Sequence, residues 1–285
     1  LGAMTKFYVG NNFLTGTLPP ELGQFTAMTI FSADNNFFTG SLPVQLAQVT
    51  ALQFLYAFNN SLTGTLPSEF GTWTDLQELS LDDNRLTGTL PTELGTWNGL
   101  RYLSIRNNSL TGPVPTEVGQ MSLLQTFDVS QNFMNGTLPT ELGQLFSLTF
   151  LHIGNNSFTG ILPEVGNMSG LELYSVNSNR FTGTLPTWLG EMTQLAFFAV
   201  FDNKMTGTLP TELGRMTSLE YLFVDINSFT ETLPTQLGLL TALQILSVSN
   251  NSLTGTLPTE LGQIAGLQHA DFSSNDFTGT LPTEI

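Results

Sequence analysis

The sequence predicts an α/β repeat solenoid, a fold in which short coils of nearly equal length stack on one another. A motif of asparagine, any residue, an apolar residue, Thr and Gly recurs at steps of 24 residues, as from Asn12 to Asn36. Leucines hold fixed places within each step. Hydrophobic residues make up 40% of the chain and charged residues 11%, a composition that suits one continuous core. A fixed period of about 20 to 50 residues is typical of solenoids.

The repeat runs through the whole chain, so residues 1–285 are expected to form a single domain of about 12 repeats. One step is shorter than the others, with 23 residues between Asn156 and Asn179. There residues 161–166 replace the usual seven-residue Thr-Leu-Pro-Thr-Glu-Leu-Gly, which predicts the loss of one residue from a surface turn. The motif asparagines are Asn12, Asn36, Asn60, Asn84, Asn108, Asn132, Asn156, Asn179, Asn203, Asn227, Asn251 and Asn275.

Each repeat is expected to contribute one strand to a parallel inner β-sheet. In the fourth repeat Leu79 and Leu81 are two residues apart, the spacing that buries alternate side chains of a strand. The motif asparagine Asn84 follows this strand, where its amide can satisfy backbone groups of its own and adjacent coils. The pattern therefore assigns the motif asparagines to the scaffold and not to catalysis.

After the strand, each repeat is expected to turn through a short 3-10 or α helix on the convex side. In residues 90–95 a proline comes early, an acid lies near the positive end of the turn, and Gly95 closes it. Glutamates recur at this place in other repeats and carry much of the negative charge. The pattern indicates a solvated structural face.

The sequence Leu-Thr-Gly-Thr-Leu-Pro at residues 86–91 resembles the plant-type leucine-rich repeat, and the resemblance covers the whole chain. It implies a right-handed superhelix with a parallel inner sheet, short outer strands and short convex helical turns. It also implies extracellular or cell-surface placement and the binding of a ligand or partner, without naming the ligand. The phrase at residues 206–214 is similar to repeat proteins of diatoms and related algae. The family usually closes its ends with cysteine-paired caps, which this sequence lacks, so end-to-end self-association of uncapped repeats is a further hypothesis.

Charge and composition exclude several classes of partner. With 7 basic and 23 acidic residues, the formal net charge of -16 repels nucleic acids and anionic membranes. No apolar stretch approaches the roughly 18 residues that span a bilayer, so no membrane insertion is expected. The absence of cysteine excludes thiolate chemistry and cysteine zinc sites, and two distant histidines, His152 and His269, make a histidine metal site improbable. No cofactor is predicted.

Ligand binding is predicted on the concave inner sheet, at positions six, four and two residues before each motif asparagine. The first of these columns is apolar for five consecutive repeats, and aromatic residues of the other columns extend it. An exposed apolar patch of this kind typically marks a contact site, and the alternative is cross-strand stacking that only stiffens the sheet. The predicted ligand-binding residues are Phe150, Leu173, Phe197, Phe201, Tyr221, Phe223 and Ile245, with a smaller cluster of Phe54, Tyr56 and Phe58.

Two polar groups on the same face are interpreted as non-catalytic. The expected solvated charges are Asp34, Glu78, Asp82, Asp83 and Arg106. Among them Asp82 and Arg106 are expected to form a surface pair of little energetic weight. Asp128, His152 and Ser175 occupy the middle column of three consecutive repeats and are the residue set of a hydrolytic triad. On an open sheet they have neither a pocket nor an oxyanion hole, so no enzyme activity is predicted.

A rival hypothesis comes from two ranks of threonine. Residues three and five after each motif asparagine are mostly Thr, and both are expected to point outward along the outer strand. This lattice resembles the Thr-x-Thr faces of ice-binding solenoid proteins. Against it, Pro113, Asn135 and Ile161 interrupt the ranks, and strand twist bends the lattice. The longest uninterrupted run is Thr182, Thr184, Thr206, Thr208, Thr230, Thr232, Thr254, Thr256, Thr278 and Thr280.

Six Asn-x-Ser/Thr sequons suit a secreted glycoprotein, although a sequence rich in these residues also makes sequons by chance. They begin at Asn59, Asn107, Asn135, Asn155, Asn167 and Asn250. The sequence therefore predicts a non-catalytic extracellular or cell-surface module for recognition or adhesion, which binds a protein, peptide or glycan on its concave face. The alternatives are ice binding through the threonine ranks and a structural wall or matrix repeat.

Overall fold

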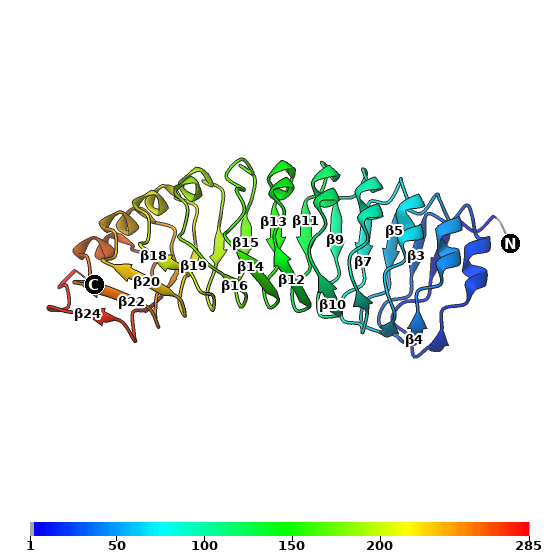
Figure 1. The fold of residues 1–285 in the computed structure, drawn as a ribbon, viewed down its shortest axis with the longest axis horizontal. Helices are drawn as coiled ribbons and strands as arrows, with labels where there is room; N and C mark the ends of the chain where they lie inside the picture. The colour runs from blue at the N-terminus through cyan, green and yellow to red at the C-terminus, as the bar shows by residue number, and fades with distance from the viewer. Residues whose placement is uncertain (1–2, 285) are drawn as a thin grey trace. The chain divides into compact units, whose positions relative to one another are not determined.

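The computed structural model describes residues 3–284 and has the stacked coils that the repeat predicts (Figure 1). By its internal contacts the chain divides into two compact units, Leu1–Leu148 and Thr149–Ile285. Within each unit every coil contributes a strand to an inner parallel sheet and then a shorter outer strand, followed in most coils by a 3-10 helix. A solenoid is thus confirmed, and its description as a single domain stays a prediction.

The first unit contains six coils within the described residues. Its inner strands are β1 (Lys6–Tyr8), β3 (Ile30–Ser32), β5 (Phe54–Tyr56), β7 (Glu78–Ser80), β9 (Tyr102–Ser104) and β11 (Thr126–Asp128). Its outer strands are β2 (Thr15–Thr17), β4 (Phe37–Ser41), β6 (Ser61–Thr63), β8 (Thr87–Gly88), β10 (Ser109–Gly112) and β12 (Phe133–Thr137). Its 3-10 helices are η1 (Pro20–Gln24), η2 (Val44–Gln48), η3 (Ser68–Thr72), η4 (Thr92–Thr96), η5 (Thr116–Gln120) and η6 (Thr140–Gln144).

The second unit repeats the same order of elements. Its inner strands are β13 (Phe150–His152), β15 (Leu173–Ser175), β17 (Phe197–Ala199), β19 (Tyr221–Phe223), β21 (Ile245–Ser247) and β23 (His269–Asp271). Its outer strands are β14 (Ser157–Gly160), β16 (Arg180–Phe181), β18 (Thr206–Gly207), β20 (Ser228–Glu231), β22 (Ser252–Gly255) and β24 (Asp276–Phe277). Its 3-10 helices are η7 (Thr187–Glu191), η8 (Thr211–Arg215), η9 (Thr235–Leu239) and η10 (Thr259–Gln263).

The short step of 23 residues changes the second unit locally. Residues 161–170 contain turns but no 3-10 helix, whereas the equivalent place in the coils with 24 residues is helical, as in η4. In η4 two 3-10 hydrogen bonds follow each other, from the Leu94 N–H to Pro91 and from the Trp97 N–H to Leu94. The described residues of the short coil have only the second, from the Met168 N–H to Val165, because the deletion leaves Pro163 and Val165 two residues apart and a 3-10 bond spans three. The predicted loss of one residue from a surface turn therefore costs the whole helix.

The inner strands pair so that equivalent positions of successive coils form columns. In the first unit Leu55 pairs with Leu79, Leu79 pairs with Leu103, and all three side chains are fully buried. In the second unit Phe198 pairs with Leu222 in the same way. Each such apolar side chain contributes about 1.5 to 3 kcal/mol when it is fully buried. The columns are therefore the continuous core that holds the coils together.

The motif asparagines connect each coil to the one before it, as the sequence predicts. The side chain of Asn108 is 7% exposed. Its amide nitrogen donates to the carbonyl oxygens of Leu81 at 3.0 Å and Ile105 at 3.3 Å. Its amide oxygen accepts the backbone N–H of Leu86 at 2.9 Å. The Asn108 side chain thus supplies the acceptor for the buried Leu86 N–H and shares two carbonyl oxygens with the motif asparagines of the neighbouring coils.

The residue before each motif asparagine has a left-handed backbone, with φ between 50° and 55°. Asn or Asp occupies most of these places, and both residue types tolerate this conformation. Ile226 is an exception with a φ of 52°, because a β-branched residue is a genuine outlier in the left-handed region. The same coil contains Glu231 at a φ of 64°, where the other coils have glycine. The coil of β19 and β20 therefore holds two strained residues.

Candidate binding surface

The inner face of each unit consists of the side chains six, four and two residues before each motif asparagine. Strand alternation predicts that these side chains point away from the core. The predicted ligand-binding residues are all half-buried there, namely Phe54, Tyr56, Phe58, Phe150, Leu173, Phe197, Phe201, Tyr221, Phe223 and Ile245. Each of them keeps part of its side chain available for contact with a ligand.

The apolar column predicted for the second unit is continuous across its strands. Phe150 pairs with Leu173, Leu173 with Phe197, Phe197 with Tyr221, and Tyr221 with Ile245. Neighbouring strands lie about 4.8 Å apart, so the side chains of this row touch or nearly touch. The structure therefore places these five residues side by side on one face.

Four aromatic residues of this face, Phe197, Phe201, Tyr221 and Phe223, form a connected group, called here the aromatic cluster. The ring centroids of Phe197 and Tyr221 lie 5.8 Å apart, and those of Phe197 and Phe223 lie 5.6 Å apart. Phe201 meets Phe223 edge to face at 6.3 Å. Such pairs contribute about 0.5 to 1.5 kcal/mol beyond their buried area. The aromatic cluster is therefore preorganised, as the rings hold one another in place.

Carboxylates border the aromatic cluster at both ends of its strands. Glu220 precedes Tyr221 at the start of β19, and its carboxylate accepts the amide N–H of Gln244 at 2.9 Å. Asp202 and Asp225 follow the other ends of β17 and β19, and the N–H of Asp202 donates to the carbonyl oxygen of Asp225 at 3.1 Å. The inner-face columns of the second unit contain neither Lys nor Arg among the described residues. The electrostatic potential here favours a cationic partner.

Asp225 has the least satisfied carboxylate on this face. Its Oδ1 atom is buried and has no hydrogen-bond partner among the described residues. Burial raises the pKa of the Asp225 carboxyl, while a hydrogen bond from Ser247 acts in the opposite direction. The negative charges of Asp271 and Asp202 raise this pKa further. A buried oxygen without a donor costs free energy, so the charged form of Asp225 is destabilised here.

In the smaller cluster of the first unit, the hydroxyl of Tyr56 is hydrogen-bonded to a carboxylate of the same sheet. The rings of Phe54 and Tyr56 stack at a centroid distance of 6.4 Å, and the Tyr56 hydroxyl donates to Glu78 at 2.6 Å. Burial and the contact with Glu78 raise the pKa of Tyr56 well above its usual range. Because the polar end of Tyr56 is already paired, this cluster offers a ligand less than the aromatic cluster does.

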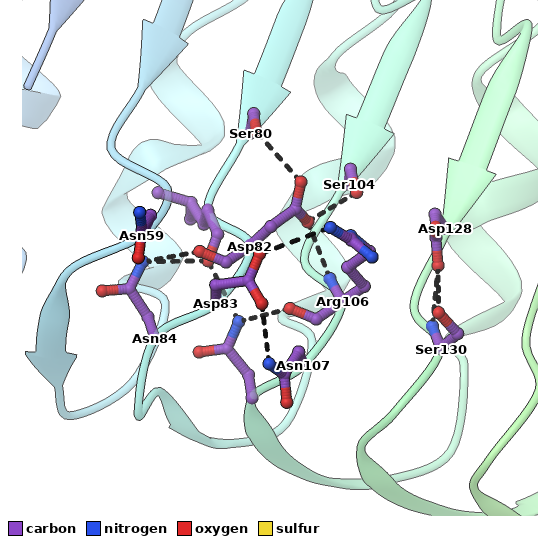
Figure 2. A network of polar contacts seen from close by, with 12 residues as sticks. Asn59, Ser80, Asp82, Asp83, Asn84, Ser104, Arg106, Asn107, Asp128 and Ser130 are labelled. Carbon is purple, nitrogen blue, oxygen red and sulfur yellow. Dashed lines mark hydrogen bonds and ion pairs between the residues drawn. The ribbon is translucent and has the colours of Figure 1, made fainter. Parts of the chain in front are cut away.

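The expectation of solvated charges is wrong for Asp82 and Asp34, which are each only 7% exposed. Asp82 accepts hydrogen bonds from the hydroxyls of Ser80 and Ser104 and from the backbone N–H of Arg106 at 2.9 Å (Figure 2). These donors from its own and the next coil replace water, so the carboxylate can be buried. Burial still raises the pKa of Asp82.

The predicted pair of Asp82 and Arg106 is also wrong in its partner. The Arg106 guanidinium lies 3.4 Å from Asp83, the residue in the left-handed turn, and both side chains are partly exposed. The Asp83 carboxylate also accepts the amide N–H of Asn107 at 2.7 Å (Figure 2). Such an exposed pair contributes about 0 to 1 kcal/mol, which agrees with the small weight predicted for it.

Two residues of the set that resembles a hydrolytic triad, Ser175 and Asp128, have hydrogen bonds to residues outside the set. The Ser175 hydroxyl donates to Oδ1 of Asn177 at 2.7 Å, and the Asp128 carboxylate accepts the hydroxyl of Ser130 at 2.6 Å. A nucleophilic serine needs its proton directed to a general base, and Ser175 directs it to an amide oxygen. The part of the chain that the structure describes also has no group of three His, Asp or Glu placed to hold a metal ion.

The threonine ranks have a structural explanation. The first-rank hydroxyls of Thr182 and Thr206 donate to the carbonyl oxygens of Gly160 at 3.2 Å and Gly183 at 3.4 Å in the preceding coil. In the second rank, the γ-methyl of Thr184 lies 2.7 Å from where a Cβ would stand on Gly207. Threonine and glycine therefore pack between coils, which accounts for both ranks without an external ligand.

The expected strand geometry of the threonine ranks holds in the first unit for β2, β4 and β12, which contain both ranks, and is wrong in the second unit, where the described outer strands end before the second rank. Gly207 separates the two ranks of its coil with a φ of 78°, and β18 ends there, so Thr208 lies outside the strand. The charged residue Glu231 stands between Thr230 and Thr232, within the run that the sequence presents as uninterrupted. A flat lattice of strand hydroxyls does not form in the second unit, and the geometry does not favour ice binding.

All six sequon asparagines have exposed side chains. Four of them occupy the left-handed turn before the motif asparagine, namely Asn59, Asn107, Asn155 and Asn250. Their exposure is compatible with attached glycans, and the modification itself stays a prediction.

Sequence reasoning missed two residues of the surface, Asp225 and Ile226. Both had a signal in the sequence: Asp225 stands in the column two residues before the motif asparagine, in the same row as Phe201. Ile226 stands where other coils have mainly Asn or Asp. Only the structure shows that the Asp225 oxygen lacks a donor and that the Ile226 backbone is left-handed.

Comparison with known proteins gives the relationships of the fold. Residues 86–201 and 139–281 match a family model described as a leucine-rich repeat region, and residues 51–73 match one described as a leucine-rich repeat. No curated protein matches the sequence. Among residues 3–284, no helix has the length and apolar character needed to cross a membrane.

Several solved structures resemble this one. The crystal structure of a TDR receptor has a TM-score of 0.95 and 32% identity, and the match covers 99% of this chain and 49% of that one. The ectodomain of the Arabidopsis receptor kinase HAESA, in complex with an extended IDA peptide hormone, has a TM-score of 0.78 and 26% identity, with coverage of 99% and 56%. A Leptospira interrogans leucine-rich repeat protein has a TM-score of 0.72 and 32% identity, with coverage of 99% and 75%. The chain spans about half the length of the TDR receptor and of the HAESA ectodomain. The resemblance to diatom and algal proteins stays a prediction.

Proposed function

Because this chain belongs to the leucine-rich repeat family, we propose that its inner face binds a peptide or an extended segment of a protein. The observation that carries the proposal is the aromatic cluster, four half-buried residues of the inner face that are connected by three ring contacts. Structural relatives support it, since HAESA has been solved in complex with the peptide hormone IDA and the receptor RGFR1 in complex with RGF2.

The chemistry of the aromatic cluster suits this role. Tyr and Phe present large contact areas with few rotatable bonds, so they lose little conformational entropy on binding. Residues that dominate a protein interface are enriched in Tyr and Trp and lose about 2 kcal/mol or more on truncation. The row from Phe150 to Ile245 extends the apolar surface along the coils. A peptide in an extended conformation can follow such a row, one side chain after another.

Extracellular placement belongs to the same proposal. Two observations support it: plant relatives of the fold are receptor-kinase ectodomains, and all six sequon asparagines are exposed. Expression through a eukaryotic secretory pathway, followed by mass spectrometry before and after removal of N-glycans, tests it. We expect glycan mass on Asn107 or Asn155, and an unglycosylated secreted chain would remove the sequons as support.

The experiment for binding uses a displayed library of random dodecapeptides, selected on the whole chain. The inner-face variant replaces Phe197 and Tyr221 with Ser. The matched control replaces Thr208, Thr232 and Thr256 with Lys, so that the outer side of the same unit changes. Circular dichroism melts establish that both variants fold before affinities are compared.

The expected result is a set of enriched peptides whose synthetic forms bind the wild type and the threonine variant equally, and the inner-face variant about tenfold more weakly or worse. If the selected peptides still bind the variant with Ser at positions 197 and 221 but no longer bind the threonine variant, the binding surface is on the outer side instead. The absence of any enriched peptide on the wild type would refute the proposal.

A further inference from the structure

Resting on that proposed function, we infer that the segment bound at the aromatic cluster presents an arginine, whose guanidinium pairs with the Asp225 carboxylate beside the rings of Phe201 and Phe223. Arginine suits such a place because its planar guanidinium stacks on aromatic faces and pairs with carboxylates through a fixed fork of donors.

The rings and the carboxylate meet at one end of the strands. Ala199 pairs with Phe223. Beyond this pair, the N–H of Asp202 donates to the carbonyl oxygen of Asp225, so the two coils stay in register there. Phe201 and Asp225 are therefore side by side in the same column, about one strand spacing apart. Phe223 lies two residues before Asp225 on the same face and contacts Phe201 edge to face. A single arginine side chain can reach both rings and the carboxylate.

The Asp225 carboxylate differs from the equivalent one in the first unit. Asp82 stands at the same position of its coil, and the donors of Ser80, Ser104 and Arg106 satisfy it. Asp225 has a donor in Ser247, but its buried Oδ1 has no partner among the described residues. The fold can therefore satisfy a carboxylate at this position, and in the coil of β19 it supplies fewer donors to a half-buried Asp225, whose exposed part remains available to a ligand.

The same coil holds the strained backbone of the second unit. Ile226, next to Asp225, has a φ of 52° and is 47% exposed, and Glu231 has a φ of 64°. Backbone strain of this kind costs about 1 to 3 kcal/mol and concentrates at ligand clamps and active sites. The exposed Ile226 side chain also offers an apolar contact for the methylene groups of an arginine. The left-handed turn itself recurs in every coil, and what distinguishes this one is an exposed apolar side chain next to Asp225.

The charge around this place excludes an acidic ligand. Asp202 and Asp271 act electrostatically on Asp225, and Glu220 borders the aromatic cluster at the opposite end of β19. The whole chain has a net charge of -16. A cationic segment is attracted from a distance and then held by short-range contacts, whereas an acidic one is repelled.

The test repeats the dodecapeptide selection on the wild type and on Asp225→Asn, which keeps the side-chain shape and removes the charge. Glu191→Gln is the matched control, since it removes the same charge from an exposed side chain of η7 in the same unit, outside the inner face. Enriched peptides are then synthesised twice, once with arginine and once with citrulline, its neutral analogue. For the wild type, citrulline should weaken binding about tenfold. For Asp225→Asn the two peptides should bind within about twofold of each other, and Glu191→Gln should behave like the wild type.

The outcomes separate this inference from the proposed function. Peptides that depend on Phe197 and Tyr221 but show no preference for arginine would refute the inference and leave the proposed function standing. An equal citrulline effect in the wild type and Asp225→Asn would refute the pairing with Asp225. No enriched peptide on the wild type would refute both.

A second variant, Ile226→Asn, restores the residue type usual at this turn. It should raise the melting temperature, because the left-handed strain is relieved, while weakening the arginine peptide about threefold or more. A gain in both stability and affinity would contradict a ligand contact at Ile226.

Discussion

Replacement of Asn108 by Ala tests the hydrogen-bond ladder that joins the coils. The variant removes the donor to the Leu81 and Ile105 carbonyl oxygens and the acceptor of the Leu86 N–H. These groups are buried beneath a side chain that is itself only 7% exposed. A buried polar group left without a partner costs about 1 to 3 kcal/mol, and the Leu86 N–H becomes such a group. The carbonyl oxygens of Leu81 and Ile105 still accept the amide N–H groups of Asn84 and Asn132, so they add little to this loss. Small domains have about 5 to 15 kcal/mol in total, so the loss should be plain.

Urea unfolding followed by circular dichroism measures this loss as a change in the free energy of unfolding. Native-state hydrogen exchange then locates it, because the amides of the two coils around Asn108 should lose protection first. Asn98→Ala is the control: Asn98 is an exposed asparagine of the same unit, and its change should cost about 0.5 kcal/mol or less. A loss below about 1 kcal/mol for Asn108→Ala, or one equal to that of Asn98→Ala, would refute the assignment of the asparagines to inter-coil bonding.

Three further changes test other features of the fold. Tyr174→Phe should stabilise the chain by about 1 kcal/mol, because the fully buried Tyr174 hydroxyl has no partner among the described residues; a lower melting temperature would contradict this. Glu231→Gly should raise the urea midpoint by an amount equivalent to about 1 kcal/mol through relief of the φ of 64°, and an unchanged midpoint would show that the strain is small. The folded state binds a proton on Asp82 more tightly than the unfolded state, since burial raises its pKa, so stability should rise as pH falls through that pKa. Asp82→Asn should flatten this rise in urea midpoints taken between about pH 7 and about pH 4, and an unaltered pH dependence would exclude Asp82 as its source.

The regular parts of the fold could be predicted from the sequence because the same residue pattern recurs in every repeat. The spacing of Leu79 and Leu81 predicts the inner strand, and the place of Asn84 predicts its bonding to adjacent coils. The period also fixes the columns, so the row from Phe150 to Ile245 follows directly from the alignment of the repeats. A pattern that recurs in each coil specifies backbone, packing and register together.

Interactions of single side chains between coils could not be predicted in the same way. Asp82 looked solvated because sequence alone does not show that the hydroxyls of Ser80 and Ser104 converge on it. The sequence predicts a strand lattice for the threonine ranks because a glycine in a sequence does not reveal its backbone conformation. Only the structure shows that Gly207 is left-handed. These features depend on rotamers and on φ angles, which the repeat pattern leaves open.

The protection of single cysteines tests the central claim, the binding of a peptide on the inner face, most directly. The chain has no cysteine, so Ile245→Cys beside Tyr221 and Thr256→Cys on the outer side each give one reactive thiol. Maleimide labelling is followed by mass spectrometry with and without a saturating selected dodecapeptide. The account predicts that the peptide slows labelling of the cysteine at position 245 about tenfold and leaves position 256 unchanged. Protection at position 256 with none at position 245 would contradict it.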